Sequence, residues 1–310
     1  MAAEAVKLAE LPLVSIIVPS FNQGRFIRRT LESILSQDYR PIEIIVIDGA
    51  STDETVSILE EFSSAPELQW VSEPDKGVVD AVNKGFARAR GKIGGIQSSD
   101  DFYLPGAIRA GVEALQSDPG LAFVFGDVAK VDANGVRLER SSLGAYTLAD
   151  VLTLGIWIPQ PSTFFRMDLA KQLGGWREEV PYAADTDLWL RMALQAPAKK
   201  IDRLMAERSM HEAQRDTQGM RIVRDYRAMI DALMPQLEAR GLAGEACAGK
   251  WLIANRYDQD AGAWVRTARL WRAAIKSPSI VSRYSWRDFI PGATALRAFA
   301  SRGARMAGLR

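Results

Sequence analysis

Three aspartates lie where two apolar runs of the sequence end. Asp48 follows the run 42–47 (IEIIVI), and the pair Asp100 and Asp101 follows the run 93–99 (IGGIQSS). Acidic side chains at the end of a buried strand are costly to desolvate unless a cation or a hydrogen-bonding ligand compensates them. A divalent metal ion is the expected compensation, so these residues predict a site for a metal and a polar ligand.

An α/β fold with a mostly parallel central sheet flanked by helices would bring these carboxylates together. From residue 14 to residue 131, short β-branched runs alternate with amphipathic stretches, a pattern typical of βαβ units. The spacing from Asp48 to Asp100 leaves room for one more βα unit, so both sites should open onto the same sheet edge, where such folds bind ligands. The expected strands are 14–19, 42–48, 68–72, 92–98 and 121–131.

Several residues predict where helices and turns begin and end. Ser51 and Glu54 have the spacing of a capping box, and Asp168 is an expected N-cap. Gly174 and Gly175 should end a short helix. The expected helices are 25–36, a second one after Ser51, 78–89, 105–116 and 185–195, with a hairpin turn at 132–135 (DANG) and an extended segment at 160–165.

The last third of the chain differs in composition from the rest. It is expected to be mostly helical from residue 220, with interruptions at Pro235, Gly241, Pro278 and Pro291, so we predict a catalytic domain over 1–219 and a helical, basic region over 220–310. Residues 261–310 hold ten Lys or Arg against one acid, Asp288, a net charge of +9 in a chain whose total is +1.

This basic region predicts contact with an anionic surface. A membrane face is one candidate and nucleic acid is the other, but the chain has no aromatic-plus-basic RNA motif and no zinc-finger spacing, so nucleic acid is not expected. Trp251, Trp264, Trp271 and Trp286 alternate with arginines, and a helix with Trp on one side can lie in a membrane interface. The alternative is that these tryptophans pack on the catalytic domain and the arginines are solvated.

Nothing in the sequence directs the chain out of the cell. Cys247 is the only cysteine and cannot form an intramolecular disulfide, and the segment 1–11 carries Glu4 and Glu10 where a signal peptide would be basic. No run approaches the roughly 18 apolar residues of a spanning helix. We therefore expect a cytoplasmic protein, soluble or peripheral on the inner face of the membrane.

Two further candidates are ambiguous when taken alone. Asp185 and Asp187 would stabilise a helix start through its dipole without any catalytic role. His211 is the only histidine, and an isolated histidine is more often a packing or surface residue than a metal ligand.

Four motifs in order give these residues a common interpretation, because they resemble those of family 2 glycosyltransferases with the GT-A fold. Each motif alone is moderately specific, but the order and spacing together are a strong signal over about residues 13–217. The motifs are 14–22 (VSIIVPSFN), 47–53 (IDGASTD), 98–101 (SSDD) and 185–191 (DTDLWLR).

The resemblance implies a role for each matching residue. Asp100 would hold the ribose or the donor sugar, Asp101 would bind the metal, Mn²⁺ or Mg²⁺, and His211 would approach the metal and the diphosphate. Asp185 occupies the position of the general base. The implied donor-binding residues are Pro19, Phe21 and Asp48 at the nucleotide base, with Asp75, Lys76 and Asn83 lining the donor pocket.

The sequence also departs from the family pattern. Gly49 stands where many members have a second Asp, Ser98 replaces a frequent Asn, and Ala184 replaces a frequent Glu before the base. The Gln-x-x-Arg-Trp motif of processive synthases is absent, which favours transfer of one sugar per encounter.

The resemblance therefore implies an inverting, metal-dependent enzyme that moves a sugar from a nucleotide-sugar donor to a saccharide or lipid-linked acceptor in surface polysaccharide or glycolipid synthesis. The chemistry suits the residues, since a metal stabilises the leaving diphosphate and a carboxylate takes the proton of the attacking hydroxyl. Two alternatives are a nucleotidyltransferase, whose Gly-rich phosphate loop is missing here, and a carbohydrate- or nucleotide-binding scaffold on a transferase-like fold. A dinucleotide-dependent oxidoreductase is disfavoured, because the first βα turn lacks Gly-x-Gly-x-x-Gly.

Overall fold

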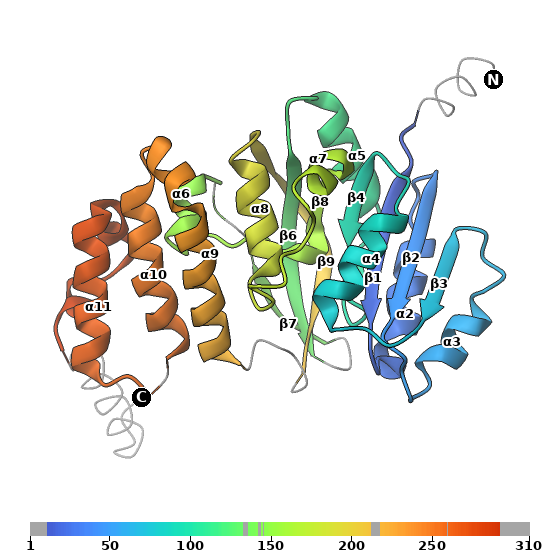
Figure 1. Ribbon diagram of the computed structural model, residues 1–310, viewed down its shortest axis with the longest axis horizontal. Helices are drawn as coiled ribbons and strands as arrows, with labels where there is room; N and C mark the ends of the chain where they lie inside the picture. The colour runs from blue at the N-terminus through green and yellow to red at the C-terminus, as the bar shows by residue number, and fades with distance from the viewer. Residues whose placement is uncertain are drawn as a thin grey trace, which may run out of the picture. The chain divides into compact units, whose positions relative to one another are not determined.

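The computed structural model describes residues 11–132, 136–141, 144, 146–211, 218–258 and 260–291. The chain divides into two compact units. The first comprises Met1–Tyr146 and Ile158–Gln214, and the second comprises Thr147–Trp157 and Arg215–Arg310. The first unit contains the sheet and the second is helical (Figure 1). The predicted boundary between residues 219 and 220 stays a prediction.

The first unit is built on one mixed sheet with the order β3-β2-β1-β4-β8-β6-β9-β5, and β7 pairs with β6. Strands β1 to β4 are mutually parallel, whereas β8 runs antiparallel to both β4 and β6. The strands are β1 Val14–Ser20, β2 Ile42–Asp48, β3 Leu68–Ser72, β4 Ile93–Ile96, β5 Phe102–Tyr103, β6 Phe123–Asp132, β7 Arg137–Ser141, β8 Thr163–Arg166 and β9 Ala198–Met210. All five predicted strands are confirmed.

Helices pack on this sheet where the sequence predicts them. α4 lies across the parallel strands (Figure 1), and its Gly85 lets the helix approach β1 closely, because a Cβ there would lie 2.4 Å from Cγ2 of Ile17. The short α7 ends as expected before Gly174 and Gly175, which both have positive φ. The helices of this unit are α2 Gly24–Leu35, α3 Thr55–Glu61, α4 Val78–Arg88, α5 Ala107–Ser117, α7 Met167–Gln172 and α8 Ala184–Ala193.

Two predicted helix caps are wrong. α3 begins at Thr55 rather than after Ser51, because the Asp53 carboxylate accepts the Thr55 N–H at 3.0 Å and takes the place of the capping box. The Ser51 hydroxyl donates to Asp48 instead. Asp168 lies inside α7, whose N-cap is Arg166.

Two other local predictions need correction or fall outside the structure. The segment 160–165 is extended only from Thr163, since Gln160–Ser162 forms a 3₁₀ turn. At the predicted hairpin turn, residues 133–135 lie outside the described chain, while β6 and β7 pair antiparallel on either side of it.

The second unit is helical as predicted and has its own small apolar core. α9 Gly219–Ala239 contains Pro235 without interruption, contrary to the prediction, because Leu233 and Leu237 are buried on both sides of it and their burial offsets the lost hydrogen bond. Gly241 and Pro278 do mark helix ends. The other elements are α6 Leu148–Leu152, α10 Ala243–Tyr257, α11 Ala263–Lys276, η3 Pro278–Arg283 and η4 Trp286–Phe289. Among the described residues, no helix combines the length and apolarity that crossing a membrane requires.

A buried carboxylate ties the amino ends of three strands together. Oε1 of Glu43 in β2 accepts the Ser15 hydroxyl at 2.6 Å and the Arg90 N–H at 2.7 Å, and Oε2 accepts Arg90 Nε at 2.9 Å. Burial alone would raise the pKa of Glu43, but these donors hold the pKa below its ordinary value of 4.5. The folded state therefore favours the ionised form of Glu43.

We predict that Glu43→Gln lowers the free energy of unfolding by about 3 kcal/mol near neutral pH, because it removes one partner of a buried charged network. Since the folded-state pKa is depressed, this contribution is present above pH 4.5 and is lost as the pH falls through the folded-state pKa. Urea unfolding of both proteins across this range should show the difference between them shrinking in acid. Glu61→Gln, at an exposed ion pair with Arg28, is the matched control and should have little effect at any pH.

Candidate active site

The carboxylate of Asp48 lies at the carboxyl end of β2 and is completely buried. It accepts hydrogen bonds from the Ser51 N–H at 2.9 Å, from the Ser51 hydroxyl at 2.5 Å and from the Ser72 hydroxyl at 2.7 Å. A carboxylate offers about four acceptor sites, so these three donors leave room for one more. Asp48 therefore organises the ends of β2 and β3 and keeps the capacity that contact with a ring N–H would need.

The loops that follow β1 and β2 are joined by reciprocal hydrogen bonds. The Asn22 N–H donates to the Ser51 hydroxyl at 2.7 Å, and the Asn22 side chain accepts the Thr52 N–H at 2.9 Å. The Gly24 N–H donates to Asp53 at 2.9 Å. Asn22 and Ala50 both have positive φ, so these two loops have a strained but well-tied backbone at the edge of the sheet.

An aromatic side chain projects from this pair of loops. Phe21 is 59% exposed, directly after the end of β1, whereas Pro19 is buried within the strand. Exposing a large apolar ring has a cost, and a flat ligand stacked on Phe21 would remove it. This is the placement expected of a residue that contacts a nucleotide base.

Asp75 lies beside the same loops. A Cβ on Gly49 would be only 2.7 Å from the Asp75 carboxylate, so the absence of a side chain at position 49 makes room for Asp75. Asp75 also accepts the Gly77 N–H at 2.8 Å, and Lys76 is exposed. The departure from the family pattern at Gly49 is thus matched by an acidic group that arrives from the next loop.

Asn83 makes a different kind of contact. Its amide nitrogen donates to the Trp176 carbonyl at 2.8 Å, and its amide oxygen accepts the Trp176 N–H at 2.9 Å. Both ends of the side chain therefore hold the turn after α7 against α4. The predicted role of Asn83 in donor binding stays a prediction.

The acidic pair after β4 separates into two environments. Asp101 is 4% exposed, and its Oδ1 accepts the backbone N–H of Ser209 in β9 at 2.9 Å. The Asp100 side chain is 15% exposed, and its Oδ2 lies 2.9 Å from Nε2 of His211. The structure thus brings Asp100, Asp101 and His211 together, and it pairs the histidine with Asp100.

Neighbouring side chains hold this cluster in place. The buried Thr30 hydroxyl of α2 lies 2.9 Å from the Ser99 carbonyl and 2.8 Å from the Asp101 carbonyl. The Ser209 hydroxyl donates to the Asp100 carbonyl. The His211 ring stacks on Phe26 of α2, with centroids 4.7 Å apart and planes 18° apart. The end of β9 and the middle of α2 therefore position the loop 98–101 from two sides.

Two buried polar groups near this loop have no hydrogen-bond partner within the described chain. They are the Ser20 hydroxyl at the end of β1 and both ends of the Gln97 amide just after β4. Leaving a buried polar group unpaired costs about 1–3 kcal/mol. A bound polar ligand or water at the carboxyl ends of β1 and β4 would remove that cost.

The donor set suits a divalent cation that is completed by a substrate. Among the described residues there is no group of three or more His, Cys, Asp or Glu side chains placed to hold a metal by itself. Mg²⁺ and similar ions are commonly bound by one or two carboxylates together with substrate phosphates. The partly exposed carboxylate of Asp100 with the His211 imidazole fits this pattern better than the buried Asp101 carboxylate.

The segment that carries the predicted base is anchored by a buried ion-pair network. Asp187, in the first turn of α8, is completely buried and pairs with Arg177 and with Arg191, whose Nε lies 2.7 Å from Oδ2. Arg191 also donates to the carbonyls of Leu173 and Gly175. Asp185 precedes this network by two residues and accepts the Thr186 N–H at 2.6 Å. Asp187 therefore fixes the start of α8, where Asp185 is half-buried.

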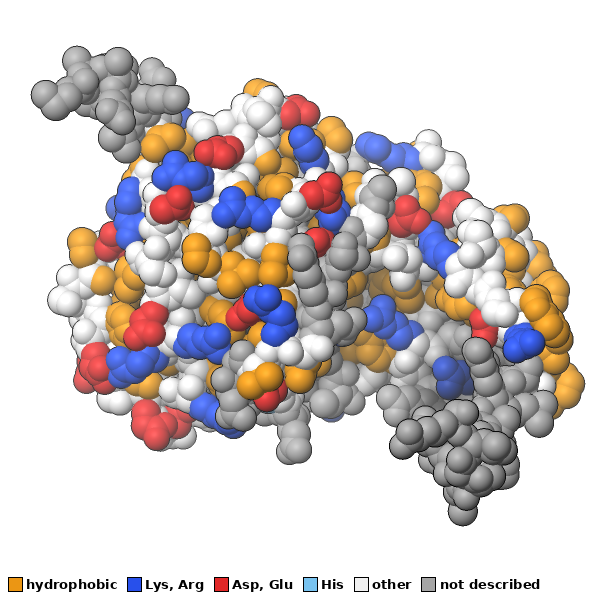
Figure 2. All heavy atoms as spheres, turned by 180° about the vertical axis from the view of Figure 1, so that it is seen from behind, with side chains coloured by type: hydrophobic (Ala, Val, Ile, Leu, Met, Phe, Trp, Pro, Cys, Tyr) orange, Lys and Arg blue, Asp and Glu red, His pale blue; other side chains and the backbone are white. Residues whose placement is uncertain are grey.

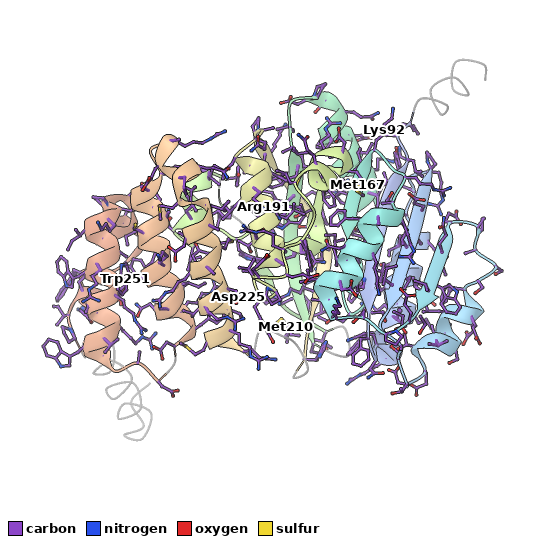
Figure 3. The ribbon with its side chains drawn as sticks, viewed as in Figure 1. Lys92, Met167, Arg191, Met210, Asp225 and Trp251 are labelled. Carbon is purple, nitrogen blue, oxygen red and sulfur yellow. The ribbon has the colours of Figure 1, made fainter. Side chains whose placement is uncertain are left out.

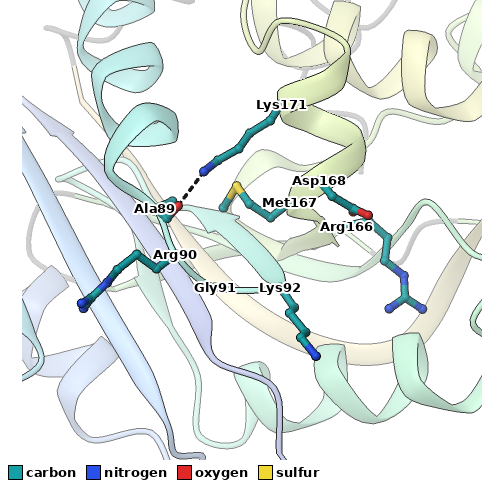
Figure 4. Close-up of a pocket in the computed structure, with 8 residues that line it drawn as sticks. All are labelled: Ala89, Arg90, Gly91, Lys92, Arg166, Met167, Asp168 and Lys171. Atoms are coloured by element: carbon teal, nitrogen blue, oxygen red, sulfur yellow. Dashed lines mark hydrogen bonds between the residues drawn. The ribbon is translucent and has the colours of Figure 1, made fainter.

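A separate depression of about 390 Å³ lies at the other edge of the sheet (Figure 4). Gly91 and Lys92, which line it, precede β4, whereas the acidic cluster follows β4. Figure 3 shows Lys92 and Met167 at one end of the strands and Met210, next to His211, at the opposite end. Two of the basic side chains that line the depression already have partners, since Lys171 donates to the Ala89 carbonyl at 2.6 Å and Arg90 pairs with Glu43.

The residues that support the carboxylates are not evident from the sequence. Ser72 and Ser209 carried no signal, because each acts on an aspartate that is distant in sequence. Thr30 does carry a sequence signal, because it is a polar side chain on the buried side of α2, next to Leu31 and in line with Ile27 and Ile34. A polar residue on such a face indicates a hydrogen-bonding role.

Comparison with known proteins places the chain among sugar transferases. The model of the family described as Glycosyl transferase family 2 matches residues 15–174. A chondroitin synthase of Escherichia coli is 29% identical over 212 residues, which cover 67% of this chain but only 30% of the synthase. An uncharacterized glycosyltransferase of Mycobacterium tuberculosis is 34% identical over 190 residues, or 60% of this chain and 71% of that protein. The chain thus spans less than a third of the length of the chondroitin synthase.

Solved structures share the fold. S. aureus TarS 1–349, in complex with UDP-GlcNAc, superposes with a TM-score of 0.61 at 16% identity, covering 88% of this chain and 93% of that one. The mannosyltransferase PcManGT from Pyrobaculum calidifontis, in complex with GDP-Man and Mn²⁺, gives a TM-score of 0.63 at 20% identity, covering 96% of this chain and 81% of that one.

We predict that Asp187→Asn destabilises the first unit by about 3 kcal/mol, because two arginines then lose their buried partner. Urea unfolding measures this loss. Asp202→Asn is the matched control, since Asp202 is likewise ion-paired, with Lys200, but its side chain is 95% exposed, so the free energy of unfolding should hardly change. An equal effect of the two substitutions would contradict the anchoring role of Asp187.

Proposed function

Because the chain belongs to glycosyl transferase family 2 and has the GT-A fold, we propose that it transfers a single sugar, with inversion, from a nucleotide-sugar donor to a hydroxyl acceptor. The observation that carries this proposal is the pairing of Asp100 with His211 at the sheet edge, beside the buried carboxylates of Asp48 and Asp101. This edge combines a carboxylate–imidazole pair with unpaired buried polar groups, which together suit a charged, hydroxyl-rich ligand.

The nucleotide would bind at the ends of β1 and β2. Phe21 offers an exposed ring for the base, and Asp48 has one remaining acceptor site for a ring N–H. Pro19, buried near the end of β1, would support this end of the site. Asp75 and Lys76 come from the adjacent loop, where the lysine charge complements a phosphate. The two structural neighbours were solved with UDP-GlcNAc and GDP-Man, which supports a nucleotide-sugar donor without identifying the base.

Asp100 and His211 would hold the metal, Mn²⁺ or Mg²⁺, with the diphosphate completing its coordination. When bound, the metal supplies positive charge to the leaving diphosphate. Asp101 would act as a positioning residue, because its carboxylate is buried and accepts the Ser209 N–H. The sequence resemblance instead implies that Asp101 binds the metal and that Asp100 holds the ribose or the donor sugar.

Asp185 would act as the general base. The attacking hydroxyl is a weak nucleophile, so a carboxylate within about 3 Å must accept its proton as the bond to the anomeric carbon forms. Direct displacement inverts that carbon in one step, and no covalent nucleophile on the protein is required. Asp187, Arg177 and Arg191 would hold the helix start in the geometry this step needs.

The acceptor would be a saccharide or a lipid-linked sugar in the synthesis of a surface polysaccharide or glycolipid. The chondroitin synthase among the relatives supports a polysaccharide role. A cytoplasmic enzyme that is peripheral on the inner face of the membrane would meet lipid-linked acceptors there, and absence of the Gln-x-x-Arg-Trp motif favours one transfer per encounter.

The proposal is tested by thermal shift with nucleoside diphosphates and their sugars, with and without Mn²⁺, because a ligand of the native state raises its stability. One nucleotide should stabilise the protein in a Mn²⁺-dependent way. Asp100→Asn should abolish the Mn²⁺-dependent part, whereas Asp101→Asn should keep it in a less stable protein. If no nucleotide causes a shift, the scaffold alternative gains support; if only Asp101→Asn loses the Mn²⁺ effect, Asp101 is the ligand.

Asp185→Asn should retain donor binding and lose transfer by at least about a hundredfold, the usual contribution of a general base. Turnover of the identified donor with a hydroxyl acceptor measures this loss, and NMR of the product gives its anomeric configuration. Near-normal turnover of Asp185→Asn would show that another group is the base, and a retained configuration would exclude direct displacement.

A further inference from the structure

The second unit exposes an apolar stripe along α11. Trp264, Ala268, Trp271 and Ile275 recur at spacings of four, three and four residues, which return to one side of a helix with about 3.6 residues per turn. Trp264 is 78% exposed, Trp271 53% and Ile275 74%. The opposite side of the helix, with Leu270 and Ala273, packs into the core of the unit. The stripe is therefore not needed to hold α11 in place.

The segment η4 extends this apolar surface. The Trp271 indole N–H donates to the Phe289 carbonyl at 3.0 Å, and the two rings meet edge to face with centroids 5.1 Å apart. This contact holds η4 next to α11, and η4 carries Trp286, which is 67% exposed. Figure 2 shows the hydrophobic side chains, in orange, gathered over the second unit toward the right of that view.

Cations accompany the exposed aromatic rings. Arg272 and Lys276 directly follow Trp271 and Ile275, and Arg287 lies over the Trp286 ring at 5.3 Å. Within residues 218–258 and 260–291, the acid Asp258 pairs with Arg269, while Arg272, Lys276 and Arg287 form no ion pair. The Arg272 guanidinium also lies over the Trp251 ring at 4.7 Å, but no acid of the described chain neutralises any of these three cations, so their charge is available to an anionic surface.

We propose that this surface, formed by α11 and η4, binds the interface of an anionic lipid bilayer. Tryptophan prefers the headgroup region because its ring is apolar and its N–H is polar, and a helix with one apolar side can lie flat in that region. Charge complementarity favours lipid over an apolar protein partner, because residues 261–310 hold ten Lys or Arg and one acid, Asp288, and acids outside this range pair, among the described residues, with Arg269 and Arg283. The proposal does not depend on the transferase activity.

The test is co-sedimentation of the full chain with phosphatidylcholine vesicles that contain about one third phosphatidylglycerol, and with pure phosphatidylcholine vesicles. Binding should require the anionic lipid and weaken with salt. Trp264→Ser combined with Ile275→Ser should weaken binding by about tenfold or more, because both side chains are exposed and leave the folded core untouched. Arg272→Gln combined with Lys276→Gln should weaken it about fivefold per charge removed.

Leu138→Ser combined with Met220→Ser is the matched control, since these exposed apolar side chains lie outside α11 and η4. This control and Asp185→Asn should both bind vesicles like the unmodified chain, which separates this proposal from the proposed function. Failure of the unmodified chain to bind anionic vesicles at low salt would overturn the proposal. So would equal binding by the Trp264→Ser, Ile275→Ser variant. Sedimentation velocity showing a dimer that this variant dissociates, without vesicle binding, would assign the surface to a second copy of the chain.

Discussion

The candidate site depends on how the sheet compensates carboxylates that it buries at its own edge. Asp48 and Asp101 are almost inaccessible to water, and an uncompensated ion in such a place is unstable. Each receives hydrogen bonds from a neighbouring segment: Asp48 from Ser51 and Ser72, and Asp101 from the Ser209 N–H. These bonds tie the loop after β2 to the end of β3, and the loop after β4 to β9. The buried carboxylates therefore both supply the negative charge near a ligand and hold the loops that would bind it.

The same constraint explains why adjacent aspartates can differ in role. Neighbouring residues after a strand point in different directions, so Asp101 faces β9 and becomes enclosed, while Asp100 faces His211 and keeps some exposure. The sequence alone does not show which of the two aspartates is buried. The deciding partner, Ser209, lies more than a hundred residues away, and the pairing of β9 with β6 brings it to the loop.

The parts of the fold that could be predicted from the sequence are those governed by local pattern. The strands Ile42–Asp48 and Leu68–Ser72 were predicted at their observed bounds, because each is a short β-branched or aromatic run between clear turn residues. The predictions that failed had a local signal overruled by a competing contact. Asp53 displaced the capping box of Ser51, and buried leucines carried α9 through Pro235. Of the candidate site, the sequence predicted the acids and the histidine but not the hydroxyl and N–H donors that hold them.

The two units contain opposite kinds of unfavourable group: buried polar groups in the first and exposed apolar rings in the second. In the first unit, buried carboxylates are stabilised by hydrogen bonds from neighbouring segments, and the need to keep these bonds restricts the loops to one arrangement. In the second unit, large apolar rings remain in water although an apolar core lies on the other side of the same helix. Trp271 shows that packing alone does not resolve this, since its N–H is bonded to Phe289 while half of its surface stays exposed. The exposed apolar stripe on α11 is bordered by cations, so an environment that is both apolar and anionic would stabilise it most. The headgroup region of an anionic membrane is such an environment.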